Sequence, residues 1–306
     1  QRLEEIVVLA ELFIEVYNCF EQQQTPEYRE IQQMIYWFVS DYSDVFVTER
    51  IRQGVDPARD FAVKIIMDSD LNDLRYLYRY GEYVTENELR TAGYLNSLDE
   101  KEIQAMADTY TEGYRIGFVH GGKDLSRKLT VNIRYHLGFE RMVRAAIRNF
   151  DRMGLKPVIY RYALNTVNKR GDSRIGYIGA VPNKQFDYDH RKDAAIYLDK
   201  KFVERRLGVM RSAYETFKTL AAGHAGPAVI ETFGETPFTP AQQDCGYHFS
   251  EKQQQLMVKM NNEAVQLTNQ YIIGKERSFT IIAFPVPEIG ERFEEIFADT
   301  VRINTL

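Results

Sequence analysis

The chain has 306 residues, of which 44% are hydrophobic and 27% are charged, and its formal net charge is −5. This composition is typical of a folded globular protein and excludes an intrinsically disordered chain. The sequence has no run of about 18 apolar residues and no cluster of Lys and Arg, so we expect neither a membrane nor a nucleic acid as a partner. Two cysteines, Cys19 and Cys245, are too few for a disulfide framework, which favours a cytoplasmic protein.

Residues 1–110 are predicted to form a helical domain. This part contains three Gly and two Pro, whereas residues 111–306 contain sixteen Gly and seven Pro. Apolar side chains recur at three- and four-residue spacing from Leu3 to Phe20, as expected for one stripe of a helix. Further helices are expected to begin just after four typical N-cap residues, Thr25, Asp56, Asp70 and Asp99.

Residues 111–306 are predicted to alternate between strands and helices. Strands are expected at 129–135, 157–162, 175–181, 227–233 and 279–284. The last of these is almost continuously apolar, which predicts that both of its faces are covered. Helices are expected at 139–153, 189–221, 250–271 and 288–298, with Asp189 as the N-cap of the second. The alternation predicts an α/β fold, in which the helical domain is followed by a mostly parallel sheet with helices on both faces.

The ends of the predicted strands offer one candidate ligand site. Ligands of open α/β sheets bind beyond the carboxyl ends of the strands. By that rule the site would be lined by His136, Gly138, Gly234, Glu235, Thr236, Pro285 and Pro287. The alternative is that these are ordinary turn residues that connect strands to helices.

Asp187, Asp189, His190 and Asp193 form a second candidate, a metal-like group. Carboxylates with an imidazole would suit Zn, Mn or Co. The alternative is structural: Asp189 would cap a helix, Asp193 would lie in its first turn, and nearby Lys and Arg would make this a solvated face. The sequence contains no dinucleotide-binding, P-loop, zinc-protease or serine-hydrolase motif, so no catalytic residue is assigned.

From about Glu102 to Leu306 the chain resembles the N-terminal α/β domain of the aminopeptidase T family. Five stretches carry the resemblance: TEGYRIGFVHGGKDLS, NIRYHLGFERMVRAAIRNFDRMGLKPVIYRYA, DYDHRKDAAIYLDKKFVERRL, AGPAVIETFGETPF and ERSFTIIAFPVPEIGERFEEIF. The last one is distinctive, because a strand leads into a Pro-x-Pro turn. The part before residue 100 looks like an extension that some relatives have.

The resemblance implies a cytoplasmic, homodimeric metallo-aminopeptidase of the leucyl type, which releases N-terminal amino acids from peptides with two divalent metals (Co, Zn, Mn or Mg). The family's metal ligands are Glu, His and Asp residues of a C-terminal catalytic domain that has no counterpart before Leu306. No metal-ligating or catalytic residue is therefore carried over to this chain, and no cofactor is assigned to it. A peptide substrate would bind through the missing catalytic domain.

These observations lead to two expectations about function. The first is that the chain, which starts at Gln1 and ends at Leu306, is the non-catalytic N-terminal portion of a longer aminopeptidase and is inactive alone. The second is a stand-alone α/β module that binds a small ligand or a protein without catalysis. The residues alone do not decide between them.

Overall fold

A computed structural model describes residues 3–161, 176–244 and 246–304 of the chain, with the side chains from residue 6 onward. Cys245, parts of the expected strands at 157–162 and 175–181, and the last two residues lie outside the described ranges. No helix in the described ranges is long and apolar enough to cross a membrane.

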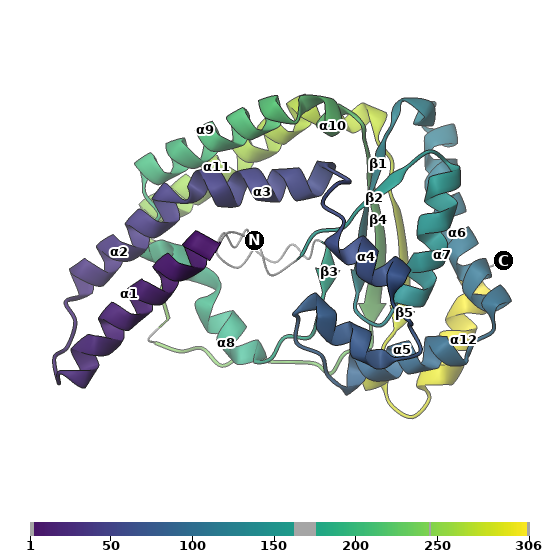
Figure 1. Cartoon of the computed structure of the whole chain (residues 1–306), viewed down its shortest axis with the longest axis horizontal. Coiled ribbons are helices and arrows are strands. Elements are labelled where there is room, and N and C mark those ends of the chain that lie inside the picture. The colour runs from purple at the N-terminus through teal and green to yellow at the C-terminus, as the bar shows by residue number, and fades with distance from the viewer. Residues whose placement is uncertain (1–2, 162–175, 245, 305–306) are drawn as a thin grey trace.

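Helices make up most of the chain (Figure 1). The α-helices are α1 (Leu3–Glu21), α2 (Tyr28–Asp41), α3 (Ser43–Val55), α4 (Phe61–Asp68), α5 (Glu86–Ser97), α6 (Glu100–His120), α7 (Glu140–Arg152), α8 (Lys184–Asp189), α9 (Lys200–Thr216), α10 (Lys218–Ala222), α11 (Glu251–Tyr271) and α12 (Phe293–Asn304). Short 3₁₀ helices are η1 (Leu74–Tyr80), η2 (Leu125–Arg127), η4 (His190–Ile196), η5 (Gly274–Glu276) and η6 (Pro287–Ile289).

The strands form one parallel sheet in the order β2-β1-β4-β5, and β3 also pairs with β1. Their bounds are β1 (Thr130–His136), β2 (Lys156–Val158), β3 (Tyr177–Ile178), β4 (His224–Phe233) and β5 (Thr280–Pro285). Each parallel pair is connected through helices, as such pairs require. The prediction of an α/β fold with a parallel sheet flanked by helices is confirmed.

The larger hydrophobic core lies between the sheet and helices α6, α7 and α12. Alternate residues of β1, Val131, Ile133 and Tyr135, enter this core. Phe284 of β5 stacks on Phe297 of α12, with ring centroids 5.0 Å apart. The period-two pattern of the sequence correctly predicted that this side of β1 is buried. Thr130 and Asn132, on its other side, are buried as well.

A second core joins the N-terminal helices to segments from much later in the chain. Helix α3 packs along α9, and α9 packs along α11. The buried members include Val47 and Ile51 of α3, Leu207 and Met210 of α9, and Leu267 of α11. Figure 1 shows these long helices side by side, extending away from the sheet. The expected division at residues 110/111 falls inside α6, and both cores combine residues from the two sides of it.

Several expected helix starts were misplaced. Helix α2 begins at Tyr28 behind Glu27, not behind Thr25, and Asp56 ends α3 instead of capping α4. The long helix predicted from Asp189 begins only at Lys200, where the Asp199 carboxylate accepts a hydrogen bond of 2.7 Å from the Phe202 N–H. Asp99 does cap α6, in a reciprocal capping box with Glu102.

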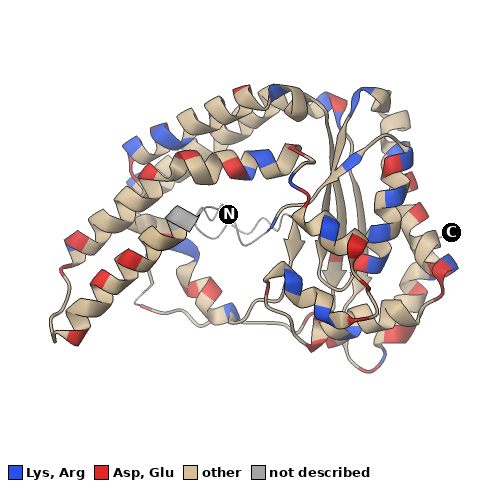
Figure 2. Cartoon of the chain, in the orientation of Figure 1, with Lys and Arg blue, Asp and Glu red and all other residues tan. Residues whose placement is uncertain are grey.

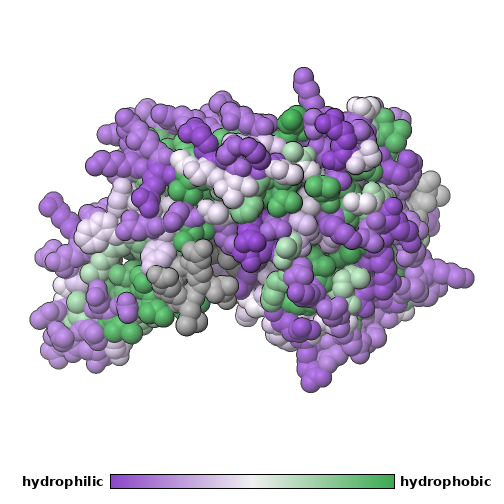
Figure 3. All heavy atoms as spheres, turned by 45° about the horizontal axis from the view of Figure 1, so that its top comes forward, coloured by the Kyte–Doolittle hydropathy of each residue, from purple (hydrophilic) through white to green (hydrophobic). Residues whose placement is uncertain are grey.

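The outer end of the molecule, made by α1 and α2, is acidic and apolar. Helix α1 carries Asp or Glu side chains but no Lys or Arg, as Figure 2 shows. Phe13 and Phe20 of α1 and Trp37 of α2 are more than half exposed. Figure 3 shows apolar side chains gathered at this end. Packing on the rest of the second core therefore covers α1 incompletely.

The expected coverage of residues 279–284 on both faces is wrong. Ser278 and Thr280 point toward glycines of α6, whereas Phe279 is 64% and Ile281 54% exposed on the opposite face. Helix α3 contacts β1 and β2. The remainder, which we call the open sheet face, consists of Arg134 of β1, Val229 of β4, and Phe279 and Ile281 at β5, placed together by the strand register.

Arginines of α7 hold the ends of two other helices. The Arg144 guanidinium donates hydrogen bonds of 2.6 and 2.5 Å to the carbonyls of Ile66 and Ser69 at the end of α4. Arg141 donates in the same way to carbonyls at the end of α5, and Arg148 follows on the exposed side of α7. These donors satisfy C-terminal carbonyls that have no partner inside their own helix.

Arg144→Gln is expected to lower the free energy of unfolding by about 1 to 3 kcal/mol, because two carbonyls lose a charged donor. Urea denaturation followed by circular dichroism measures the loss. Arg148→Gln is the matched control on the same helix and should change stability by less than about 0.5 kcal/mol. Equal losses in the two variants would show that the carbonyl contacts are not the source.

Candidate functional site

The predicted strand-end residues lie at one edge of the sheet, but helix α5 covers that edge. An added Cβ at Gly138 would touch Glu88 and Thr91 of α5, and Asn87 accepts a hydrogen bond from the Glu288 N–H. Pro285 and Pro287 are buried there. In Figure 1, α5 lies beside these strand ends.

Most of these residues have structural partners. Thr236 donates its backbone N–H to Glu288, at 2.6 Å, and Glu235 accepts a hydrogen bond from Thr232, at 2.6 Å. Gly234 has a φ of +89°, and a side chain there would strike Ile289. His136 lies on the neighbouring strand and is half-buried. The structure therefore brings Gly234, Glu235 and Thr236 together in the turn after β4, and His136 ends the adjacent strand β1.

A buried carboxyl group that the sequence analysis missed lies at the same end of β1. Glu140 is the first residue of α7 and is completely buried. Its Oε2 atom accepts hydrogen bonds from the Tyr76 hydroxyl, at 2.7 Å, and from the Gly138 N–H, at 2.8 Å. Its Oε1 atom is buried and has no hydrogen-bond partner among the described residues.

Burial raises the pKa of Glu140 to about 7, although the hydrogen bonds from Tyr76 and from the backbone oppose this rise. The effect of burial is larger, because a carboxylate loses more hydration than two donors replace. A carboxyl group with such a pKa can exchange a proton near neutral pH. Acidic residues are common at helix starts, so the position of Glu140 in the sequence gives no signal of a raised pKa.

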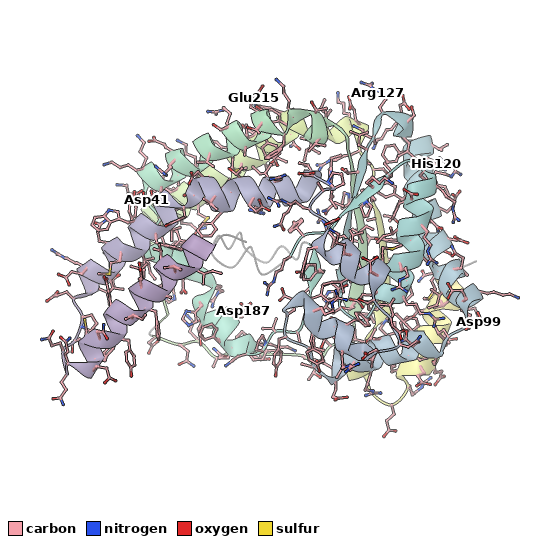
Figure 4. The ribbon with its side chains drawn as sticks, viewed as in Figure 1. Asp41, Asp99, His120, Arg127, Asp187 and Glu215 are labelled. Atoms are coloured by element: carbon pink, nitrogen blue, oxygen red, sulfur yellow. The ribbon has the colours of Figure 1, made fainter. Side chains whose placement is uncertain are left out.

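The metal-like group does not fit a metal site. His190 Nδ1 lies 2.8 Å from Asp193 Oδ2, while Asp189 is the last residue of α8 and accepts a hydrogen bond from Gln185, at 2.7 Å. Asp187 lies in the first turn of α8, away from the sheet, as Figure 4 shows. In the described part of the chain no group of three or more His, Cys, Asp or Glu residues could hold a metal ion. The structure does not support the expectation that these four residues converge.

A basic cluster lies on and beside the open sheet face. Arg134 projects from β1 on the side away from Val131 and Ile133, and its Nε donates to Asn132 Oδ1, at 2.8 Å. Arg277 precedes β5, and the charges of Arg277, Arg134 and Lys128 all act on His224 at the start of β4. Figure 4 labels Arg127, next to Lys128, at the end of the sheet where β1 begins.

His224 is held neutral inside this cluster. Burial is the main reason that its pKa falls to about 3, and the three neighbouring positive charges lower it further. Its side chain is nearly buried, at 7% exposure, and its Nδ1 atom has no hydrogen-bond partner among the described residues. The sequence had one usable signal for this cluster, because the alternation in β1 places Asn132 and Arg134 on the same face.

Comparisons with known proteins add no family to this picture. No family model, no curated protein and no solved structure matches the chain.

Proposed function

We propose that this chain is the non-catalytic N-terminal portion of a metal-dependent aminopeptidase of the leucyl type. The observation that carries the proposal is where the resembling stretches lie in the fold. They include nearly all of β1-α7-β2, β4 and β5-η6-α12, which are the elements of the parallel sheet and its main core. The resemblance thus follows the sheet and two of the helices packed on it, α7 and α12, and is not scattered over surface loops.

In this proposal the chain supports an active centre formed by other residues. Two divalent metals would activate water and polarise the scissile carbonyl of a peptide. The described residues do not fit such a pair of ions, because His190 and Asp193 bind each other and Asp189 binds Gln185. The helices α1 and α2, with their exposed apolar side chains, are available for contact with another subunit or domain.

Hydrolysis of leucine p-nitroanilide tests this proposal. The chain alone, supplied with Co, Zn, Mn or Mg, is expected to release no more nitroaniline than the metal salt alone. The complete product of the source gene is expected to hydrolyse the anilide, and a chelator should abolish this activity. Metal-dependent turnover by the chain alone would refute its non-catalytic role. Absence of turnover by the complete gene product with every metal would refute the aminopeptidase assignment.

A further inference from the structure

Two arginines at the open sheet face have no anionic partner among the residues that the structure describes. The Nη atoms of Arg134 make no hydrogen bond to any described residue, and the Arg277 side chain makes none either. Both side chains are half-buried. Lys128, in contrast, is paired with Glu276 at 2.9 Å and also donates to the Ala222 carbonyl. Charges that are withdrawn from water are normally paired with an opposite charge. Two guanidinium groups without such a partner among the described residues therefore need an explanation.

Arg277 directly precedes Ser278, whose N–H donates to the Ala225 carbonyl, so Arg277 lies beside the start of β4, where His224 pairs with Thr130. Arg134 lies four residues further along β1, and its Nε donates to Asn132 Oδ1, between Arg134 and Thr130 in the sequence. Burial lowers the pKa of Arg134, and the charge of Arg277 lowers it further. Neighbouring positive charges disfavour each other, and an anion bound beside them relieves this. Arginine presents a planar fork of donors that matches a carboxylate or a phosphate.

Two buried polar atoms next to the arginines are also unpartnered. Thr130, at the start of β1, is fully buried, and its Oγ1 atom has no hydrogen-bond partner within the described ranges. Thr130 is paired in register with His224, whose Nδ1 atom is the second unpartnered group. Buried hydroxyl and imidazole groups are normally hydrogen-bonded. The positive charges of Arg277 and Arg134 both act on His224.

Beside the cations the open sheet face is apolar. Val229 lies next to Arg134 in the strand register, and Ile281 lies next to Val229. Ile281 and Phe279 are more than half exposed. A ligand that places an anion on the arginines would therefore lay its remaining atoms on a hydrophobic surface, where their burial is favourable.

We infer that the open sheet face binds an oxyanion, a carboxylate or a phosphate, carried on an apolar body, and that Arg134 and Arg277 are the residues that bind the anion. Thr130 and His224 lie buried at the polar end of the site, at the start of β1 and β4, and Val229, Phe279 and Ile281 form its apolar floor. This inference goes beyond the aminopeptidase proposal and does not depend on it, since the site needs no metal.

Isothermal titration of the whole chain with phenyl phosphate, benzoate and neutral benzamide, at constant ionic strength, tests the site. We expect phenyl phosphate or benzoate to bind and benzamide not to bind, and the stronger of the two anions identifies the headgroup. Arg277→Gln should weaken binding of that anion about tenfold or more, since it removes hydrogen bonds to a charged group. Arg134→Gln should act in the same direction. Arg148→Gln, on the exposed side of α7, should leave the dissociation constant unchanged.

The apolar floor is tested by Ile281→Ser, which should weaken binding of phenyl phosphate or benzoate but leave binding of inorganic phosphate unchanged. Circular dichroism of each variant checks its fold, and if Arg134→Gln does not fold, the wild-type and Arg277→Gln titrations decide. Failure of both anions to bind wild-type protein would overturn the inference. Equal affinity of the wild type and Arg277→Gln would also overturn it. Anilide hydrolysis is measured separately, so its outcome does not bear on this result.

Discussion

Glu140→Gln is expected to remove a loss of stability that the wild-type chain undergoes as the pH rises from about 4.5 to about 7. The pKa of Glu140 is about 7 in the folded state and 4.5 in its ordinary state. Between these values the folded chain keeps a proton that the unfolded chain has lost, so the free energy of unfolding falls as pH rises. At about 1.4 kcal/mol per pH unit, the loss amounts to roughly 3 kcal/mol. Glutamine does not titrate and keeps an acceptor for Tyr76 and Gly138.

Urea unfolding at pH 5, 6, 7 and 8 measures this effect as the difference between variant and wild type. The difference should shift in favour of the variant by roughly 2.5 kcal/mol across the series, because a small part of the loss occurs below pH 5. Glu86→Gln, which changes an exposed carboxylate on α5, should follow the wild-type profile. Tyr76→Phe removes a donor to the carboxylate, so it should destabilise the chain more at pH 8 than at pH 5. Parallel profiles for wild type and Glu140→Gln would show that Glu140 does not titrate with a raised pKa.

The buried His224 contributes to the pH dependence of stability with the opposite sign. Its contribution cancels when the free energy of unfolding of the wild type is subtracted from that of the variant. The pKa of His224 falls to about 3 from its ordinary 6.5. Between these values the unfolded chain binds a proton that the folded chain does not, so stability is lost as pH falls. In the wild type the two groups oppose each other between pH 4.5 and 6.5. The variant lacking Glu140 should therefore gain stability with rising pH throughout that interval.

Gly226→Ala is expected to destabilise the chain by about 4 kcal/mol or more, if it folds at all. Gly226 lies where β4 departs from regular pairing with β1, at a φ of +115°. An added Cβ would lie 1.9 Å from the Ser278 carbonyl oxygen, which belongs to backbone and cannot move aside alone. The Gly226 carbonyl also accepts a hydrogen bond from the Tyr114 hydroxyl, at 3.0 Å. The substitution therefore disturbs the join between β4, β5 and α6.

Gly208→Ala is the matched control for this substitution. Gly208 lies inside α9, and an added Cβ would meet no atom within 4 Å. Alanine there should stabilise the chain by about 0.5 to 1 kcal/mol, because helical glycine loses more conformational entropy on folding. Denaturant midpoints of both variants give the comparison. A loss below about 1 kcal/mol in Gly226→Ala would mean that this backbone can relax away from Ser278.

Local sequence signals predicted helices best where a single capping residue determines the start of the helix. Ser250 starts α11 with the expected capping box, and Asp99 starts α6 in the same way. Helix α3 was missed because its N-cap, Tyr42, makes no side-chain capping hydrogen bond. Asp189 was misread because it has a typical capping side chain but ends α8 instead. A side chain capable of capping is common, and the backbone around it decides whether it caps.

The candidate sites were less predictable than the elements that carry them. The rule for strand ends selected Gly234, Glu235 and Thr236, which follow the carboxyl end of β4. It could not show that α5, from earlier in the chain, would cover that end. Glu140 was hidden for a similar reason, since its pKa depends on Tyr76, which is 64 residues away. Such contacts over long sequence separation leave no local pattern.

The sequence by itself determined the α/β class, the parallel strands and the buried side of β1, because hydrophobic periodicity and capping act over a few residues. The tertiary structure decided the remainder. It packed α3 against α9 and α11 and left one face of β5 exposed. It also brought three basic side chains into one cluster: Arg134 from β1, His224 from the start of β4, and Arg277 from the segment before β5. Each outcome depends on which surfaces meet when distant segments pack. The side chains become buried, and their charges come close together, only when that packing forms.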